Sequence, residues 1–281
     1  MKIGNTEIFV IQDGTFKLDG GAMFGIVPKP LWSRLIPADE QNRIVLGLNC
    51  LLVIRKNERI LIDTGVGDKF DAKSERIYGI EANRKNLLQG LVEKGLQPED
   101  ITHVIMSHMH FDHIGWNTRR DDSGELKPTF SNAVYFAQKG EFETANNPDS
   151  RSRGSYLAEN WAPLEAAEQL QLLNGTSEVL PGIESVVTGG HTKHHTMVKI
   201  DTGGTTVCFL ADLAPTSAHL KTPYVMGYDL YPRQTIEMKP KVLRQAFDEK
   251  WLIVFPHDAN ALGGYLKQDG KNWFVDRVNL S

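Results

Sequence analysis

Three histidines and one aspartate lie within six consecutive residues of this chain. The segment covers residues 108–113, with the sequence HMHFDH, and follows the apolar run 101–106 after one residue, Ser107. Such a run predicts a buried β-strand, so the four side chains are expected on the loop at its end. Imidazoles and carboxylates this close are costly to bury unpaired, whereas divalent transition metals such as zinc bind this mixture of nitrogen and oxygen donors. The segment therefore predicts a metal site.

Further side chains that could bind metal follow predicted strands later in the chain. The strand-like segments 185–190, 206–211 and 251–256 are each followed at once by such a residue. These residues are His191, Asp212 and His257. Because an accidental histidine cluster would not be matched at several other strand ends, the pattern favours a metal centre over a solvated histidine-rich loop.

The order HxHxDH, then His, Asp and His, resembles the two-metal hydrolases of the metallo-β-lactamase fold. The resemblance covers nearly the whole chain and implies one domain over residues 1–281, of class α/β (α+β), built as a four-layer αββα sandwich. It also implies the metal ligands, which are His108, His110 and His191 for the first ion, Asp112, His113 and His257 for the second, and Asp212 as a bridge. Two divalent transition-metal ions are thus expected, with zinc favoured and iron, manganese or cobalt tolerated.

The same resemblance assigns supporting roles to two residues that do not bind metal. Asp63, in the segment LIDTG, matches an early strand-end aspartate that orients the site from behind the ligands, although a simple turn residue is the alternative. His195 matches a supporting histidine. His194 stands where the family pattern usually has glycine, so it is either an extra group behind the ligands or a surface residue.

Two features resemble one branch of this family. Segments 19–32 and 227–232 resemble the YtnP-type quorum-quenching lactonases and the related methyl-parathion-hydrolase-like group. The branch implies that a metal-bridging hydroxide opens a lactone ring, with N-acyl-homoserine lactones as the leading substrates. Organophosphate triesters or aryl esters are the alternative substrates. A noncatalytic, metal-stabilised binding protein is an alternative of another class, which a bridging Asp212 disfavours.

The resemblance breaks down at one catalytic position. Many of these lactonases carry a tyrosine three residues after the bridging aspartate, but Pro215 stands there in this chain. We expect Tyr228 to supply the hydroxyl group instead, with Tyr224 and Tyr231 as alternatives and an aromatic pocket wall as the other role for any of them. The expected catalytic residues are Asp112, which could also pass a proton to the leaving group, Asp212 and Tyr228.

The segment from residue 23 to residue 32 is apolar but interrupted by glycine and proline. We expect Met23, Phe24 and Trp32 to line the substrate pocket. Packing on the core or on a partner subunit is the alternative, and one loop could do both in a homodimer. The expected partner is therefore a small-molecule lactone or ester, with a second copy of the chain as a further candidate.

Composition excludes several other classes of function. The 281 residues are 41% hydrophobic and carry a formal net charge of −4, with lysine and arginine scattered along the chain, so nucleic acid is not an expected partner. No apolar run is long enough for a membrane span or a signal segment. Cys50 and Cys208 lie in predicted core strands and are interpreted as buried hydrophobic residues. A cytoplasmic protein is expected.

Strands and helices are predicted to alternate along the chain. Strands are expected at residues 7–11, 48–54, 59–63 and 273–275, and helices at 82–94 and 232–250. A polar helix at 139–146 begins a middle segment, to about residue 170, which we expect to be an insertion that forms one wall of the cleft.

Overall fold

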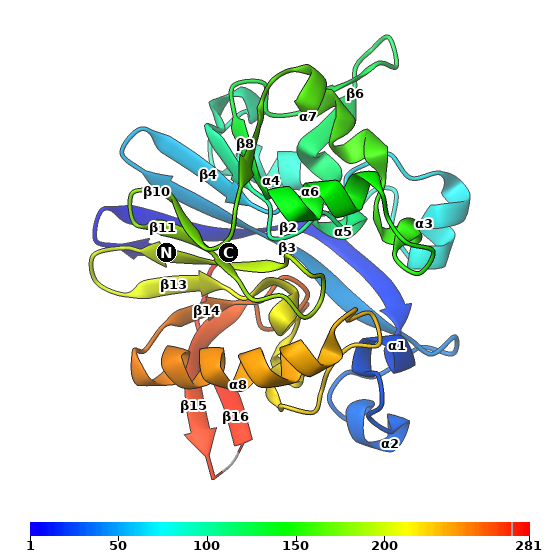
Figure 1. Cartoon of the computed structure of the whole chain (residues 1–281), viewed down its shortest axis with the longest axis vertical. Helices are drawn as coiled ribbons and strands as arrows, with labels where there is room; N and C mark the ends of the chain where they lie inside the picture. Colours follow the sequence, from blue (N-terminus) through cyan, green and yellow to red (C-terminus); the bar gives the residue numbers. More distant parts are fainter. Residues whose placement is uncertain (271) are drawn as a thin grey trace.

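Two seven-stranded sheets face each other, and helices cover the outer face of each (Figure 1). The computed structural model describes residues 1–270 and 272–281. The first sheet contains, in spatial order, β1 (Lys2–Ile3), β2 (Thr6–Asp19), β3 (Arg43–Arg55), β4 (Glu58–Ile62), β5 (His103–Ile105), β8 (Val134–Gln138) and β9 (Leu170–Leu173). The second contains β10 (Ser177–Leu180), β11 (Ile183–Val187), β12 (Thr196–Asp201), β13 (Thr206–Phe209), β14 (Leu252–Val254), β15 (Gly263–Asp269) and β16 (Asn272–Arg277). A separate hairpin pairs β6 (Thr118–Arg120) with β7 (Leu126–Pro128).

The pairing of the strands brings the predicted ligand segments to one edge. In the first sheet β4 and β5 are parallel, so the residues that follow them emerge on the same side. In the second sheet β13 and β14 are parallel, and β11 runs in the same direction because both β11 and β13 are antiparallel to β12. The loops after these five strands therefore meet at one end of the sandwich.

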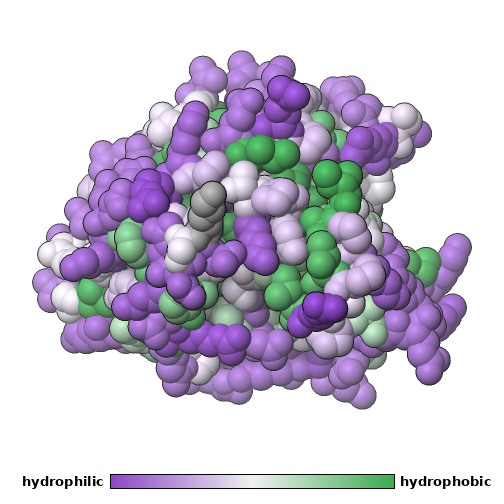
Figure 2. Space-filling view, turned by 90° about the horizontal axis from the view of Figure 1, so that it is seen from below, coloured by the Kyte–Doolittle hydropathy of each residue, from purple (hydrophilic) through white to green (hydrophobic). Residues whose placement is uncertain are grey.

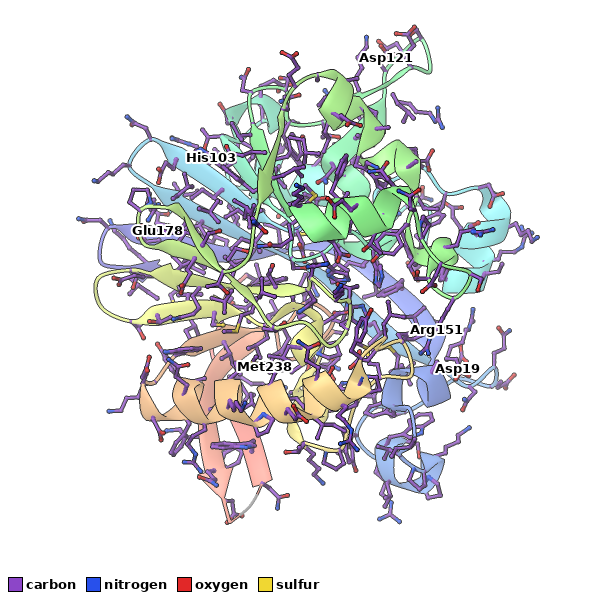
Figure 3. The ribbon with its side chains drawn as sticks, in the orientation of Figure 1. Asp19, His103, Asp121, Arg151, Glu178 and Met238 are labelled. Atoms are coloured by element: carbon purple, nitrogen blue, oxygen red, sulfur yellow. The ribbon has the colours of Figure 1, made fainter. Side chains whose placement is uncertain are left out.

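The strands have long apolar runs because both of their faces are buried. In β3, Leu51 and Val53 pack between the two sheets, while Cys50 and Leu52 face the helices on the outer side. The same alternation occurs in β13, where Cys208 faces outward. Strands that are buried on both faces are uniformly hydrophobic rather than alternating. Side chains fill the space between the sheets (Figure 3).

Helices form the two outer layers. The first sheet is covered by α4 (Leu87–Glu93), α6 (Lys139–Asn146) and α7 (Ala162–Ala166), and the second by α8 (Pro232–Asp248). The remaining α-helices of the described residues are α1 (Gly20–Phe24), α2 (Lys29–Trp32), α3 (Ala72–Tyr78) and α5 (Phe111–Ile114). Short 3-10 helices lie at Pro98–Asp100, Gly115–Asn117, Arg153–Ser155, Ala158–Asn160, Ala211–Leu213 and Ser217–Leu220. The four-layer αββα order agrees with the predicted fold class.

The predicted helix at 82–94 begins five residues late. Asn86 accepts a hydrogen bond from the backbone N–H of Gln89, whose side chain in turn accepts one from Asn86, so a capping box starts the helix at Leu87. Before it, Arg84 donates from Nε to the backbone oxygen of Asp13 at 2.9 Å, which holds this stretch against β2.

Figure 2 shows the molecule from below, where most of the surface is hydrophilic. Hydrophobic residues gather toward the right half of this view, which is the side on which α1 and α2 lie in Figure 1. The segment joining these two helices exposes Ile26 almost completely, at 93%. Among the helices of the described part of the chain, α8 is the longest at 17 residues, and none has the length and apolar character needed to cross a membrane.

Candidate metal centre

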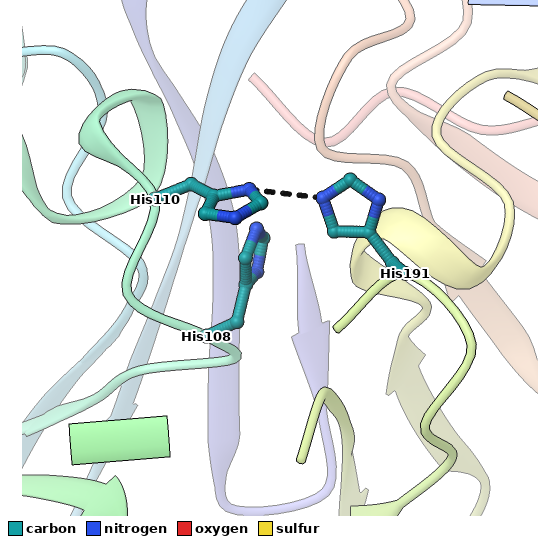
Figure 4. A group of neighbouring side chains, drawn as sticks. All are labelled: His108, His110 and His191. Carbon is teal, nitrogen blue, oxygen red and sulfur yellow. Dashed lines mark hydrogen bonds between the residues drawn. The ribbon is translucent and has the colours of Figure 1, made fainter. Parts of the chain in front are cut away.

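The first group of predicted ligands converges in space. His108 and His110 lie on the loop after β5, and His191 lies on the loop after β11 (Figure 4). Their ring nitrogens all lie within 4.8 Å of one another, and Nδ1 of His110 is 3.0 Å from Nε2 of His191. Burial, reinforced by the neighbouring imidazoles, lowers the pKa of His108 and of His110 well below the ordinary value. Both rings are therefore neutral and able to bind a metal ion.

Asp112, His113 and His257 form the second group. Nδ1 of His113 lies 2.7 Å from a carboxylate oxygen of Asp63, and Nδ1 of His257 lies 2.9 Å from the backbone oxygen of Gly47. Both partners only accept hydrogen bonds, so in each neutral ring the proton is on Nδ1 and the lone pair is on Nε2. These two Nε2 atoms are 3.1 Å apart. Burial lowers the pKa of His113, but Asp112, Asp212 and Asp63 outweigh it and raise this pKa well above the ordinary value, so without a metal ion a proton lies between the two Nε2 atoms. A metal ion can take the place of this proton, so the donors present fit a metal ion.

Asp212 lies between the two groups. Its Oδ2 is 3.2 Å from Nε2 of His191, and its Oδ1 is 3.3 Å from Nε2 of His257. Burial alone would raise the pKa of Asp212, but the surrounding imidazoles hold it well below the ordinary value, so the carboxylate is ionised. Oδ1 of Asp212 and Nε2 of His108 and His110 are buried without a hydrogen-bond partner among the described residues. Such orphaned acceptors also fit two cations, with Asp212 placed to bridge them.

His195 hydrogen-bonds to the backbone of Asp212. The backbone N–H of Asp212 donates to Nε2 of His195 at 2.9 Å, and Nδ1 of His195 lies 2.6 Å from the hydroxyl oxygen of Thr188. Burial and the neighbouring His191 lower the pKa of His195 to about 3, so the ring is neutral. Because Nε2 already accepts a hydrogen bond, His195 is not available as a ligand. His194, by contrast, is half-buried and packs over Gly140 of α6.

Asp63 organises the loop that carries the first ligands. Its Oδ1 accepts from the backbone N–H of Ser107, and its Oδ2 accepts from the hydroxyl of Ser107 and from His113. The backbone of Asp63 has φ 56°, a left-handed conformation that non-glycine residues seldom adopt. The three hydrogen bonds stabilise this conformation at the end of β4.

Two carboxylates that lie at the site, Asp229 and Glu141, were assigned no role from the sequence. Oδ1 of Asp229 lies 3.0 Å from Nδ1 of His191 and fixes that ring, while Oδ2 accepts from Thr235 in the first turn of α8. Asp229 stands in the segment GYDLYP, just before a predicted helix, which was the available signal. Glu141 is buried and accepts from the hydroxyls of Tyr156 and Thr192. It carried no signal, because a glutamate at the start of a polar helix resembles a solvated one.

A cavity of about 280 Å³ opens onto the metal centre. Its apolar and aromatic lining comprises Leu18, Met23, Tyr78, Phe111, Met226, Tyr228 and Leu230. Its polar lining comprises His110, Asp112, His191, Asp212 and His257, together with Arg151, Ser152, Gly154, Ser155 and Gly227. Residues 151–155 belong to the middle segment, which was predicted to form one wall of the cleft.

Tyr228 and Met23 line this cavity, but two other predicted pocket residues lie behind it. Phe24 and Trp32 are fully buried with stacked rings, whose centroids are 5.3 Å apart, and Phe24 also stacks on His219 at 4.5 Å. These contacts place Phe24 and Trp32 in the core beneath the pocket wall. Burial, with the nearby charge of Asp19, raises the pKa of Tyr228 to about 12, so its hydroxyl is protonated at neutral pH.

A four-layer sandwich with two convergent His/Asp groups at one edge defines a metal-dependent hydrolase. Residues 43–257 match the sequence pattern of the metallo-beta-lactamase superfamily, and the chain belongs to that superfamily. It is 26% identical to an N-acyl homoserine lactonase of Bacillus cereus over 230 residues, which cover 77% of this chain and 83% of that protein.

Solved structures agree with this assignment. A probable metal-dependent hydrolase from Staphylococcus aureus is 34% identical to this protein. The match covers 100% of this chain and 99% of that chain, with a TM-score of 0.91. AidC, a dizinc quorum-quenching lactonase in complex with a product, is 23% identical and superposes with a TM-score of 0.81 over 100% of this chain and 97% of its own. At 23% identity, the similarity to AidC supports the fold alone.

Proposed function

We propose that this protein opens a lactone ring by metal-assisted hydrolysis, with N-acyl-homoserine lactones as its leading substrates. The Nε2 atoms of His113 and His257, which lie 3.1 Å apart beside the ionised Asp212, carry the proposal, because these donors fit a cation beside the cavity. The relatives described as N-acyl homoserine lactonases support the choice of a lactone. The cavity of about 280 Å³ lies near the lower end of the range of about 300–1,000 Å³ for small-molecule sites. That size favours a substrate with a short arm.

The residues around the cavity have separate roles in this proposal. Two divalent cations, when bound, would polarise the ester carbonyl and lower the pKa of a shared water towards neutrality. Asp212 fixes the spacing of the two ligand groups, because its two oxygens face different groups. Asp112 lies in the cavity lining and passes a proton to the leaving alkoxide. Tyr228 donates a hydrogen bond from its hydroxyl to the carbonyl oxygen, where negative charge develops.

We also propose the identity of the metal, the cellular location of the protein and its oligomeric state. Zinc is the proposed metal, because three imidazoles at one position and a carboxylate with two imidazoles at the other suit it. We further propose a cytoplasmic homodimer, for which the exposed apolar residues Ile26 and Leu31 between and within α1 and α2 offer a contact surface.

Comparing substrates on one metal-defined preparation tests the proposed reaction. We expect kcat/KM for an N-acyl-homoserine lactone and a simple δ-lactone to exceed that for a nitrophenyl phosphotriester. Tyr228→Phe should lower kcat for the lactone by about tenfold to hundredfold at unchanged metal content, since it removes one donor to the developing oxyanion. A phosphotriester preference of about a hundredfold, worth about 2.7 kcal/mol of transition-state binding, would overturn the lactonase proposal.

A further inference from the structure

Arg151 is the one lysine or arginine among the described residues that line the cavity. It lies in the middle segment just before the 3-10 helix Arg153–Ser155, and Figure 3 labels it at the right of the molecule, between this segment above and the loop that leads to α8 below. Apart from the proposed ligands, the other polar side chains of the lining are the uncharged Ser152, Ser155, Tyr78 and Tyr228, and the rest of the wall is apolar or glycine. A cationic side chain thus stands on the wall of a largely apolar cavity.

The guanidinium of Arg151 is held in place from the opposite wall. Its Nη2 donates to the backbone oxygen of Gly227 at 2.6 Å and, with a longer contact of 3.4 Å, to that of Asp229. On its own side, a carboxylate oxygen of Asp149 accepts from the backbone N–H of Arg151 at 2.9 Å and from the backbone and hydroxyl of Ser152. Both ends of the side chain are therefore fixed before any ligand binds, which lowers the entropic cost of binding.

Part of the donor capacity of Arg151 is unused. A guanidinium has five N–H donors, and both recorded side-chain contacts of Arg151 come from Nη2. Its Nε and Nη1 donate to no described residue. The neighbouring hydroxyl of Ser152 is already engaged by Asp149. Arg151 is exposed, so a substrate oxygen beside it keeps part of its hydration, and a hydrogen bond from the unused charged donors adds to its binding.

We infer that Arg151 binds a carbonyl oxygen in the arm of the substrate, the amide oxygen of an N-acyl lactone, while the ester carbonyl lies at the metal centre. The inference rests on the proposed lactonase function and names the part of the substrate that this cavity recognises. Arg151 is a binding residue for the arm and takes no part in breaking the ester bond. Its contribution should therefore appear in KM rather than in kcat.

Two lactones that differ in one group test this assignment. One is N-hexanoyl-homoserine lactone, and the other is a γ-butyrolactone whose alkyl arm has the same length but lacks the amide. Arg151→Met should raise KM for the amide-bearing lactone by about tenfold to hundredfold, the loss of a hydrogen bond from a charged donor. KM for the alkyl lactone should change by less than about twofold, and kcat for both lactones should stay unchanged.

A matched control lies two residues away. Arg153 is exposed on the same segment and does not line the cavity, so Arg153→Met makes the same chemical change outside the site and should leave both KM values unchanged. Equal losses on the two lactones in Arg151→Met would mark a purely structural contact and overturn the assignment. A selective loss in Ser155→Ala with none in Arg151→Met would move the recognition to Ser155 and also overturn it.

Binding measurements keep this inference separate from the proposed reaction. Calorimetric titration of metal-loaded protein with ring-opened N-hexanoyl-homoserine and its alkyl analogue needs no turnover. If the wild-type protein hydrolyses neither lactone, the proposed function fails. The Arg151 assignment then stands only if Arg151→Met weakens the amide-bearing ligand selectively by about tenfold or more. It is overturned if the variant binds both ligands like the wild type, or if the wild type binds neither.

Discussion

At the scale of single residues, proton positions give the strongest argument for metal binding. Asp63, Gly47 and Asp229 each offer only an acceptor to the Nδ1 atom of a ligand histidine. When a metal ion is bound, the ring proton is therefore on Nδ1, and the lone pair of Nε2 is directed at the centre. The proposed ligands were predictable, because histidine and aspartate at strand ends leave a local signal. The roles of Asp229 and Glu141 were missed, because Asp229 contacts His191 38 residues away and Glu141 resembles a solvated residue of a polar helix.

Asp63→Asn should weaken metal binding at one of the two positions. Asparagine tolerates the left-handed backbone at this residue, so the substitution removes a charge and one acceptor without straining the chain. His113 then loses its fixed tautomer, and affinity for the second ion should fall by about 10- to 100-fold. Competition with a chromogenic chelator measures both affinities.

Asp68→Asn is the matched control, since Asp68 is exposed five residues further along the chain. It should bind both ions like the wild-type protein. Two unchanged affinities in Asp63→Asn would contradict the role given to Asp63, and so would an equal loss of both ions.

At the scale of elements, the sequence predicted what periodicity and burial determine. The strands around Leu51 and Val207 were recognisable because both faces of each strand are apolar. The short helices α1 and α2 have no periodic signal, and their position depends on distant packing: a Cβ at Gly20 would lie 2.3 Å from the ring of Trp32. For the same reason the sequence could not tell whether Phe24 and Trp32 line the pocket or lie beneath it.

Trp32→Ala should destabilise the protein and leave its preference for chain length unchanged. The ring is 1% exposed and stacks on Phe24, and removing a buried tryptophan costs about 3–5 kcal/mol. Denaturant unfolding measures that loss. KM for short-chain and long-chain lactones should change by the same factor. Met23→Ala, which alters the cavity lining itself, should change their ratio. A chain-length effect of Trp32→Ala at full stability would restore Trp32 to the pocket wall.

At the scale of the whole molecule, the metal centre joins the two sheets. Four of the proposed ligands follow β5 in the first sheet, and the other three follow strands of the second. The two halves also share direct contacts. The backbone of Gly47 in β3 hydrogen-bonds to both the main chain and the ring of His257, and the side chain of Asn49 donates to Phe255 and Asp258. These contacts favour the proposed single domain over residues 1–281.

Removing metal should therefore lower the stability of the entire fold. A ligand that binds only the folded state stabilises it by about 2.7 kcal/mol at a hundred times its Kd and by about 4.1 kcal/mol at a thousand times. Chelation removes this contribution and leaves the Nε2 atoms of His113 and His257, 3.1 Å apart, to share a proton. We expect chelator-treated protein to unfold at a lower denaturant concentration, in one transition detected alike by tryptophan fluorescence and circular dichroism. Added zinc should restore the midpoint, and above the Kd the stabilisation should grow with the logarithm of the free zinc concentration. A midpoint that does not respond to chelator or zinc would contradict metal binding at the junction of the sheets, and two separate transitions would contradict the single domain.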